Sequence, residues 1–260
     1  MLDRRLITSL HVQTMRRAQL HPEHEPHVLF QASTIAAMVE GAYEGDVSFA
    51  ELAEHGDFGI GTLNSLDGEM IALDGRFHRA DADGHAAEVD AGELTPFAVM
   101  AWFEPSLDFG LMECLDRDAL LAEVDRRVPP GTESCAIRVD GDFESMRARS
   151  IPRQSPPYRP LIEVLADQHV FELGAISGTM VGFRFPDYSE GLEVSGYHFH
   201  FISADRTRGG HVLGCRSAGV RVRVDFSNDL HVELPPGVDL AGAEVSESTS
   251  AALQRAQNRG

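Results

Sequence analysis

The chain has 260 residues, of which 43% are hydrophobic, enough for one large domain or two small ones with a substantial core. Its formal net charge is −19 and all 22 basic residues are Arg, which argues against nucleic acid or an anionic membrane as a partner and, without Lys, excludes Schiff-base chemistry. No run of 18 apolar residues and no signal-peptide pattern occurs, so we expect a cytoplasmic protein that does not span a membrane.

The first half of the chain predicts short strands, hairpins and a few helices. Ser33 or Thr34 is suited to cap a helix, and Ser48 with Glu51 forms a capping-box pattern at the start of another. Turn-forming residues between the apolar runs, namely glycines and the pairs Asn-Ser and Asp-Gly, indicate β-hairpins. The expected elements are consecutive hairpin strands over 57–78, strands over 28–33 and 95–103, helices over 35–42, 48–55 and 116–127, and a hairpin around Asp140 and Gly141.

The second half of the chain is richer in strands. Clustered prolines at 153–160 mark a linker, because proline continues neither a helix nor a sheet ladder. The expected elements after it are a helix over 161–166, strands over 170–173, 178–185, 197–203, 211–215, 220–226 and 230–234, and a helix near 248–257. We therefore predict an α+β or mixed α/β protein with two domains, residues 1–152 and 153–260, each built on a mixed β-sheet with a few flanking helices.

A pair of histidines in one predicted strand is the strongest functional signal. In the segment GYHFHFIS, His198 and His200 project from the same face, because successive side chains of a strand alternate. A polar turn ending in two glycines follows, and a strand that returns from His211 would carry its imidazole back beside the first two. Three neutral imidazoles around one point predict an open Zn²⁺ site. The alternative is that they are partly buried strand residues with hydrogen-bonded rings.

Charged residues at turns and strand ends are weaker candidates. Glu69 directly follows the glycine of LDGE, where it is either a rim residue or an acid–base group directed into a site. Arg147 and Arg149 alternate along one predicted strand, where each is either a solvated edge charge or, pointing inward, a bidentate clamp for a carboxylate.

Long segments of the chain resemble alpha-acetolactate decarboxylases. The similar stretches stand in family order and cover nearly everything from about residue 28 to residue 234; they include GTLNSLDGEMIALDGRFHRADADG, TPFAVMAWF, CAIRVDGDFESMRARSIPRQSPPYRPL, GTMVGFRFP and GYHFHFISADRTRGGHVLG. The resemblance implies that His198, His200 and His211 hold a zinc ion. It also implies that Thr62, Glu69 and Arg149 are active-site residues.

An activity and an assembly follow from the same resemblance. 2-Acetolactate, a small anionic β-keto acid, would lose CO₂ and give a single acetoin enantiomer, with Zn²⁺ as a Lewis acid on its ketone and hydroxyl oxygens. Arg149 would hold or polarise the anionic groups, and Glu69 would deliver the proton. Thr62 would hydrogen-bond Glu69 or a water molecule on the metal. The family is typically dimeric, so a homodimer is expected, with the metal site at the interface of the two domains.

One segment departs from the family pattern. The family has a second active-site Glu in its C-terminal helix, whereas this tail, VSESTSAALQRAQNRG, is divergent. A direct alignment places Gln257 at that position, and Glu247 is the nearest acidic candidate. Either the tail aligns differently from the family, or a neutral amide stands in place of the second carboxylate.

Two other classes of protein share parts of the pattern. A cupin-type metal dioxygenase also has an HxH motif with a later His and would use Asp205 as an acidic ligand, but its all-β fold disagrees with the helices predicted here. A zinc-stabilised binding protein would hold a structural zinc, which usually has four protein ligands. Three histidines with no nearby cysteine favour an open site over a structural one.

Overall fold

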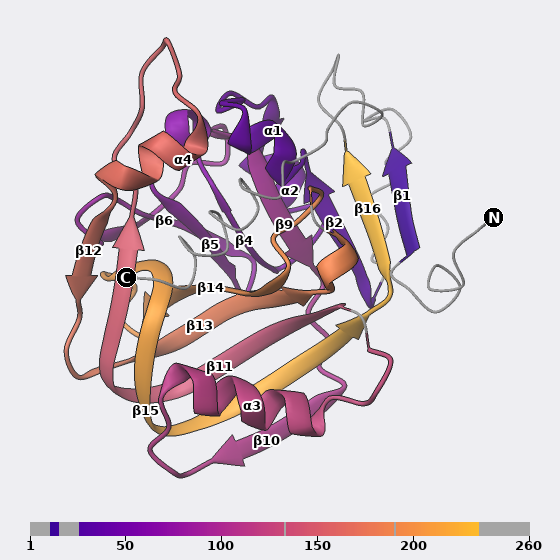
Figure 1. Cartoon of the computed structure of the whole chain (residues 1–260), viewed down its shortest axis with the longest axis vertical. Helices are drawn as coiled ribbons and strands as arrows, with labels where there is room; N and C mark the ends of the chain where they lie inside the picture. Colours follow the sequence, from indigo (N-terminus) through magenta and orange to yellow (C-terminus); the bar gives the residue numbers. More distant parts are fainter. Residues whose placement is uncertain (1–10, 16–25, 133, 190, 234–260) are drawn as a thin grey trace.

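The computed structural model describes residues 11–15, 26–132, 134–189 and 191–233, and in this part of the chain the largest sheet has eight strands (Figure 1). Parallel pairs β1–β16 and β16–β2 join antiparallel pairs in the rest of the sheet, so it is mixed, as predicted. The strand order is β1 (His11–Met15), β16 (Asp229–Glu233), β2 (Val28–Ala32), β9 (Phe97–Ala101), β4 (Phe58–Thr62), β5 (Glu69–Leu73), β6 (Arg76–Ala80) and β7 (Ala86–Glu88).

The second sheet is antiparallel and partly closed on itself. Its order is β10 (Leu107–Leu111), β15 (Gly209–Ser227), β14 (Gly196–Ser203), β13 (Ile176–Phe185), β11 (Ser134–Ser150) and β12 (His169–Glu172). Strand β15 pairs with β11 as well as with β14, and β13 pairs with both β11 and β14. These four strands therefore form a closed ring of pairings. A separate two-stranded ladder joins β3 (Val47–Ser48) to β8 (Leu94–Thr95).

Short helices flank the sheets, as the capping patterns predict. Thr34 caps α1 (Ile35–Val39), and the predicted capping box of Ser48 and Glu51 begins α2 (Phe49–Leu52). The N-cap of α3 (Arg117–Arg127) is Asp116, and α4 (Leu161–Val164) follows the proline-rich segment. Three 3₁₀ turns complete the described elements: η3 (Asn64–Leu66), η4 (Leu165–Asp167) and η5 (Asp187–Ser189). Across the described ranges, no helix combines the length and the apolar character that crossing a membrane requires.

The predicted hairpin around Asp140 and Gly141 is wrong. Strand β11 continues through both residues over 17 positions, and the strands predicted at 211–215 and 220–226 are likewise parts of the single strand β15. Gly141 has a φ of +154°, and a Cβ there would lie 2.4 Å from the Gly219 carbonyl oxygen. Glycine at this position therefore permits two long strands to approach closely, with a shift of register, instead of reversing the chain.

The sheets do not divide at the predicted domain boundary between residues 152 and 153. Strands β10 and β11 precede that boundary but belong to the second sheet, whereas β16 follows it and belongs to the first. In Figure 1, β16 crosses to the first sheet directly from the end of β15. The division of the chain into two domains stays a prediction, and the predicted C-terminal helix near 248–257 lies outside the described residues.

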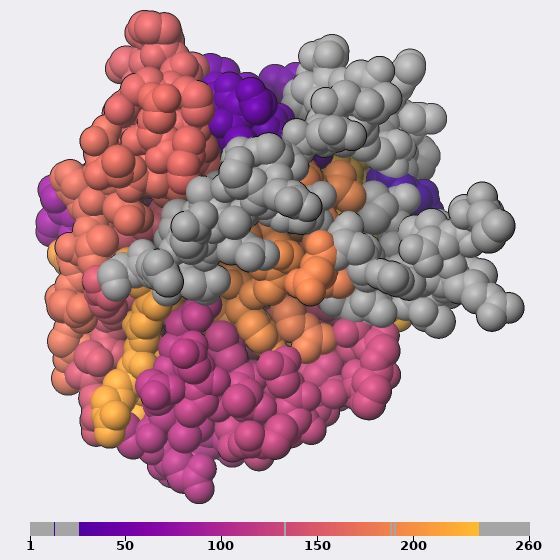
Figure 2. Space-filling model, in the orientation of Figure 1, coloured from indigo at the N-terminus to yellow at the C-terminus, as the bar shows by residue number. Residues whose placement is uncertain are grey.

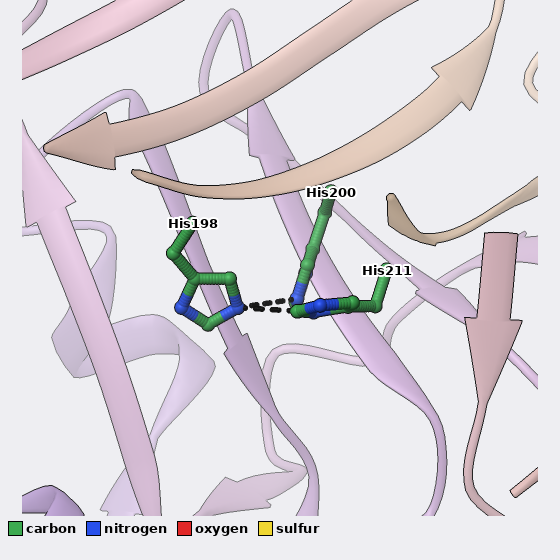
Figure 3. A group of neighbouring side chains, drawn as sticks. All are labelled: His198, His200 and His211. Atoms are coloured by element: carbon green, nitrogen blue, oxygen red, sulfur yellow. Dashed lines mark hydrogen bonds between the residues drawn. The ribbon is translucent and has the colours of Figure 1, made fainter. Parts of the chain in front are cut away.

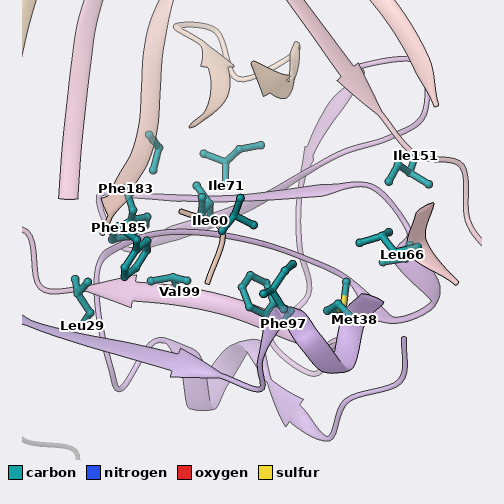
Figure 4. Packing of buried hydrophobic residues seen from close by; sticks show 14 of the residues in the cluster. Leu29, Met38, Ile60, Leu66, Ile71, Phe97, Val99, Ile151, Phe183 and Phe185 are labelled. Carbon is teal, nitrogen blue, oxygen red and sulfur yellow. The ribbon is translucent and has the colours of Figure 1, made fainter. Parts of the chain in front are cut away.

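Of the three hydrophobic clusters in the described part of the chain, two show how the second sheet packs. One cluster lies between the sheets and joins side chains of the first sheet, such as Ile60 and Ile71, to Phe183 and Ile202 of the second. The other fills the ring of β11, β13, β14 and β15 under α3. Figure 4 shows Met38, Leu66 and Ile151 toward one end of the first cluster, with Phe97 nearer its middle. That end adjoins the site described next.

Candidate active site

Strands β14 and β15 bring the three predicted histidines together. His198 and His200 are two positions apart on β14, and the register of the β14–β15 pair sets His200 opposite His211. Nε2 of His198 lies 3.2 Å from Nε2 of His200 and 3.2 Å from Nδ1 of His211, and Figure 3 shows the three rings converging. The prediction that the returning strand carries His211 back beside the other two is confirmed.

The turn between these strands depends on Asp205 and on two glycines. The Asp205 carboxylate accepts hydrogen bonds from the hydroxyls of Ser203 (2.6 Å) and Thr207 (2.8 Å). A Cβ at Gly210 would lie 2.9 Å from the Arg149 carbonyl oxygen, so the glycine lets β15 pass close to β11. Because Asp205 serves the turn and lies outside the histidine cluster, it does not act as the acidic ligand of a cupin-like site.

The histidine rings are held in the state that binds a metal. His200 Nδ1 donates to the Met70 carbonyl oxygen at 2.8 Å, which leaves the lone pair of Nε2 directed at the other rings. Burial lowers the pKa of His198 well below its usual range, and positive charges nearby lower it further. Burial also lowers the pKa of His200, against the opposing effect of Glu69. Neutral imidazoles at pH 7 are the ligand form.

The nitrogen positions fit a metal ion such as zinc. Two zinc–nitrogen bonds of about 2.0–2.1 Å at a tetrahedral angle separate their nitrogens by roughly 3.3 Å, close to the 3.2 Å found from His198 to each of its neighbours. All three candidate ligand atoms lie within 4.8 Å of one another. In the described ranges, the group of side chains that could hold a metal consists of these three histidines, so a metal there would keep open positions.

Beside the histidines lies a buried ion pair between the two sheets. Glu69 begins β5 of the first sheet, and Arg149 near the end of β11 is paired in register with His211. Arg149 Nη1 donates to Glu69 Oε1 at 2.8 Å, and Glu69 Oε2 lies 3.3 Å from His200 Nε2. Glu69 is 7% exposed and Arg149 6%, so both are interior groups instead of rim or edge charges.

Thr62 and Arg147, the other two candidates, differ in their placement. Thr62 is paired with Glu69 across β4 and β5, and its hydroxyl donates to the Gly68 carbonyl oxygen at 2.7 Å. Since that proton is used, the hydroxyl can only accept a hydrogen bond from a group in the site. Arg147 is partly exposed and lies 3.4 Å from Glu172 on β12, which agrees with the solvated alternative for this residue.

A cavity unites these residues with an apolar wall. Its polar end comprises Thr62, Glu69, Arg149 and the three histidines. Its apolar wall consists of Ile35, Met38, Leu66, Phe97, Ile151, Leu161 and Leu165. The sequence indicates these side chains only as apolar positions, because nothing in a hydrophobic pattern separates a core residue from one that lines a cavity. The Met70 carbonyl was missed for a similar reason, since a backbone acceptor carries no residue signature.

Fold and site together define a class of protein: a mixed-sheet protein with an open three-histidine centre and a buried carboxylate–guanidinium pair enclosed between two sheets. The model of the alpha-acetolactate decarboxylase family matches residues 29–247 of the chain. The chain therefore belongs to the alpha-acetolactate decarboxylase family, and the resemblance noted in the sequence is confirmed.

Relatives of known identity match over almost the whole chain. The chain is 43% identical to the alpha-acetolactate decarboxylase of Methylococcus capsulatus, with 97% of this chain and 99% of that protein covered. It is 38% identical to the enzyme of Raoultella terrigena, with 95% of each covered. The crystal structure of alpha-acetolactate decarboxylase from Bacillus subtilis strain 168 aligns with a TM-score of 0.84 at 33% identity, covering 89% of this chain and 99% of that one.

Proposed function

We propose that this chain converts 2-acetolactate to acetoin and CO₂ with a zinc ion held by His198, His200 and His211. The observation that supports this most is that the three imidazoles, the Glu69 carboxylate and the Arg149 guanidinium lie in one cavity. When bound, zinc would supply Lewis-acid polarisation of substrate oxygens. Membership of the family and the names of the relatives support the reaction.

Arg149 is the residue suited to hold the substrate carboxylate. Its Nη1 is bonded to Glu69, while its buried Nε has no hydrogen-bond partner among the described residues. An unpaired buried donor is costly, and an anionic ligand would satisfy it. The protein carries a net charge of −19, so a local cation of this kind is also needed to attract an anion into the site.

Glu69 is the residue suited to move the proton. Loss of CO₂ leaves an electron pair on the carbinol carbon, and a proton added there gives acetoin. The Glu69 carboxyl group lies between Arg149 and His200, within the same cavity, and a single donor at a fixed position would add the proton to one face of the carbon. Thr62, as an acceptor, would orient the substrate hydroxyl or a water molecule.

The apolar wall would complete the site by excluding water. Side chains such as Met38 and Leu165 would contact the methyl groups of the substrate. A dry surrounding strengthens each electrostatic interaction with the developing charge. The two candidate positions for the family's second carboxylate, Glu247 and Gln257, lie outside the described residues. A homodimer, a site at a domain interface and a cytoplasmic location are further proposals that rest on the resemblance and the composition.

Metal content and a single substitution test the proposal together. We expect stoichiometric zinc in the purified wild-type protein, loss of it in His211→Ala, and retention in the matched control His85→Ala, whose side chain is exposed. Glu69→Gln should retain zinc but lose most of the decarboxylation rate and the preference for one acetoin enantiomer. The proposal fails if Glu69→Gln keeps the wild-type rate and stereochemistry.

A further inference from the structure

The turn that precedes Glu69 has an unusual backbone. Ser65 and Leu66, in η3, have φ values of +63° and +52°, so two consecutive residues with side chains occupy the left-handed region. Residues other than glycine persist there only where the surrounding structure over-determines them, and such positions concentrate at functional sites. Leu66 is also part of the cavity wall. The turn therefore links an unfavourable backbone conformation directly to the site.

Hydrogen bonds fix both the backbone and the side chain of Ser65. Its backbone N–H donates to the Tyr43 carbonyl oxygen at 2.8 Å, and its carbonyl accepts from Gln154 N–H at 2.7 Å. Its hydroxyl donates to Glu44 Oε1 at 2.9 Å and lies 3.1 Å from the Tyr158 hydroxyl, which itself donates to Glu44. These partners come from the segment after α1 and from the predicted linker at 153–160. Each polar group of Ser65 therefore has a hydrogen-bond partner.

The neighbouring Asn64 is fixed as firmly. Its side-chain oxygen accepts from Gly45 N–H at 2.8 Å, and its side-chain nitrogen donates to the Gly45 carbonyl at 3.0 Å. This is a paired contact that mimics one rung of a sheet ladder. Four hydrogen bonds therefore attach the turn to three successive residues, Tyr43, Glu44 and Gly45.

The restrained turn leads into the catalytic candidate within four residues. Gly68 has a φ of +90°, and a Cβ there would lie 2.3 Å from the Ala80 carbonyl oxygen, so the short connection between the turn and β5 lies close against β6 and requires glycine. The Gly68 carbonyl accepts the Thr62 hydroxyl, and Glu69 follows. A shift of Ser65 would therefore be transmitted to both Thr62 and Glu69.

We infer that Ser65, with Glu44 and Tyr158, forms a positioning device that holds the Ser65–Leu66 turn in its left-handed conformation and thereby aims the Glu69 carboxyl group and the Leu66 side chain into the cavity. These three residues do not line the cavity, so they act through Glu69 and Leu66 instead of touching the substrate. The inference deepens the proposed function and rests on it for the effect on turnover, but the placement of Glu69 can be measured without turnover.

Three variants separate the hydroxyl network from the backbone conformation. Ser65→Ala removes the hydroxyl and keeps the unfavourable left-handed residue, whereas Ser65→Gly removes the hydroxyl and accepts that conformation readily. Tyr158→Phe removes one oxygen at a half-buried position and is the variant safest for folding. Ser177→Ala is the matched control, since its hydroxyl also donates to a carboxylate, that of Asp142, away from the cavity.

Steady-state kinetics and the visible spectrum of bound Co²⁺ provide two independent measurements. We expect kcat of Ser65→Ala to fall about 10- to 100-fold with KM changed less than about twofold, a partial recovery in Ser65→Gly, and a smaller fall in Tyr158→Phe. Acetoin formed by Ser65→Ala should lose enantiomeric purity. Because Glu69 Oε2 lies 3.3 Å from a candidate ligand nitrogen, the Co²⁺ spectrum should also change in Ser65→Ala but not in Ser177→Ala.

The two proposals fail in different ways. A folded Ser65→Ala with a wild-type Co²⁺ spectrum overturns the positioning role, and wild-type kcat and stereochemistry in an active enzyme overturn it equally. If the wild-type protein forms no acetoin, the proposed function fails, and the spectra then decide the positioning role by themselves. Equal effects in Ser65→Ala and Ser177→Ala would also contradict the positioning role.

Discussion

At the scale of single residues, the proposed function assigns the substrate carboxylate to the guanidinium of Arg149. It lies 2.8 Å from Glu69 and is buried, whereas Arg147, two positions earlier on β11, is partly exposed and paired with Glu172. We expect Arg149→Lys to lower kcat/KM on the order of 10²-fold, because an ammonium cannot reproduce the forked geometry of the guanidinium. The measurement is the initial rate of acetoin formation over a range of substrate concentrations.

Arg147→Lys is the matched control for this substitution. It changes the same residue type on the same strand, and its exposed ion pair contributes little, so we expect its kcat/KM to stay within about twofold of wild type. Equal losses in the two variants would mean that Arg149 has no special role in the site.

Glu193 is a buried carboxyl group with no part in the proposed chemistry. It is 2% exposed, and its Oε1 has no hydrogen-bond partner in the described part of the chain. Burial raises the pKa of this group well above its usual value. The folded state therefore binds one more proton than the unfolded state as pH rises above the ordinary glutamate range, and stability is lost in that direction.

The neutral variant Glu193→Gln removes this dependence on pH. We expect the urea unfolding midpoint of Glu193→Gln to exceed that of wild type at pH 8. Near pH 4 the two midpoints should match, because residue 193 is then largely uncharged in the wild type as well as in the variant. Midpoints that differ by the same amount at both pH values would show that the effect is one of packing and not of charge.

At the scale of elements, close strand packing behind the histidines depends on glycine. A Cβ at Gly182 on β13 would lie 2.3 Å from the His198 carbonyl oxygen, whereas a Cβ at Gly214 on β15 would meet nothing within 4 Å. We therefore expect Gly182→Ala to lower the free energy of unfolding by ~1–3 kcal/mol and to weaken zinc binding. Gly214→Ala should leave both unchanged. Chemical denaturation and a metal titration of the two variants check this.

Elements with local signals could be predicted from the sequence, and those set by distant strands could not. The capping residues Thr34 and Ser48, the helical spacing of apolar residues over 116–127, and the alternating His198 and His200 are local signals, so their elements were found. The Asp140-Gly141 pair has the composition of a hairpin turn, but its conformation is set by Gly219 on β15, some 80 positions along the chain. The same holds for the left-handed Ser65, whose partners lie at 43–44, 154 and 158.

In the candidate site, too, the residues could be named from the sequence, but their arrangement in space could not. The residue pattern left Glu69 and Arg149 each with two interpretations, and the resemblance to the family singled them out as active-site residues. Their meeting across two sheets, and the apolar wall opposite them, depend on the order of strands in space, which the sequence pattern alone does not contain.

At the scale of the whole molecule, a net charge of −19 opposes the compact state through self-repulsion. Screening shortens from about 30 Å at 0.01 M salt to about 3 Å at 1 M. We therefore expect the Tm at pH 7.5 to rise with NaCl, by roughly 2–4 °C for each kcal/mol of repulsion relieved. The increase should be much smaller near pH 4.9, where the net charge approaches zero. A flat or falling Tm at pH 7.5 would mean that the ion pairs of the surface outweigh the repulsion.

The measurement that bears most directly on the proposed function is acetoin formation from racemic 2-acetolactate, followed by chiral chromatography with and without prior treatment of the protein with a chelator. We predict rapid formation of one enantiomer by the untreated protein, its loss after chelation, and its return when zinc is added back. Acetoin formed no faster than by the spontaneous reaction, with the protein folded and zinc present, would contradict the proposed decarboxylase activity.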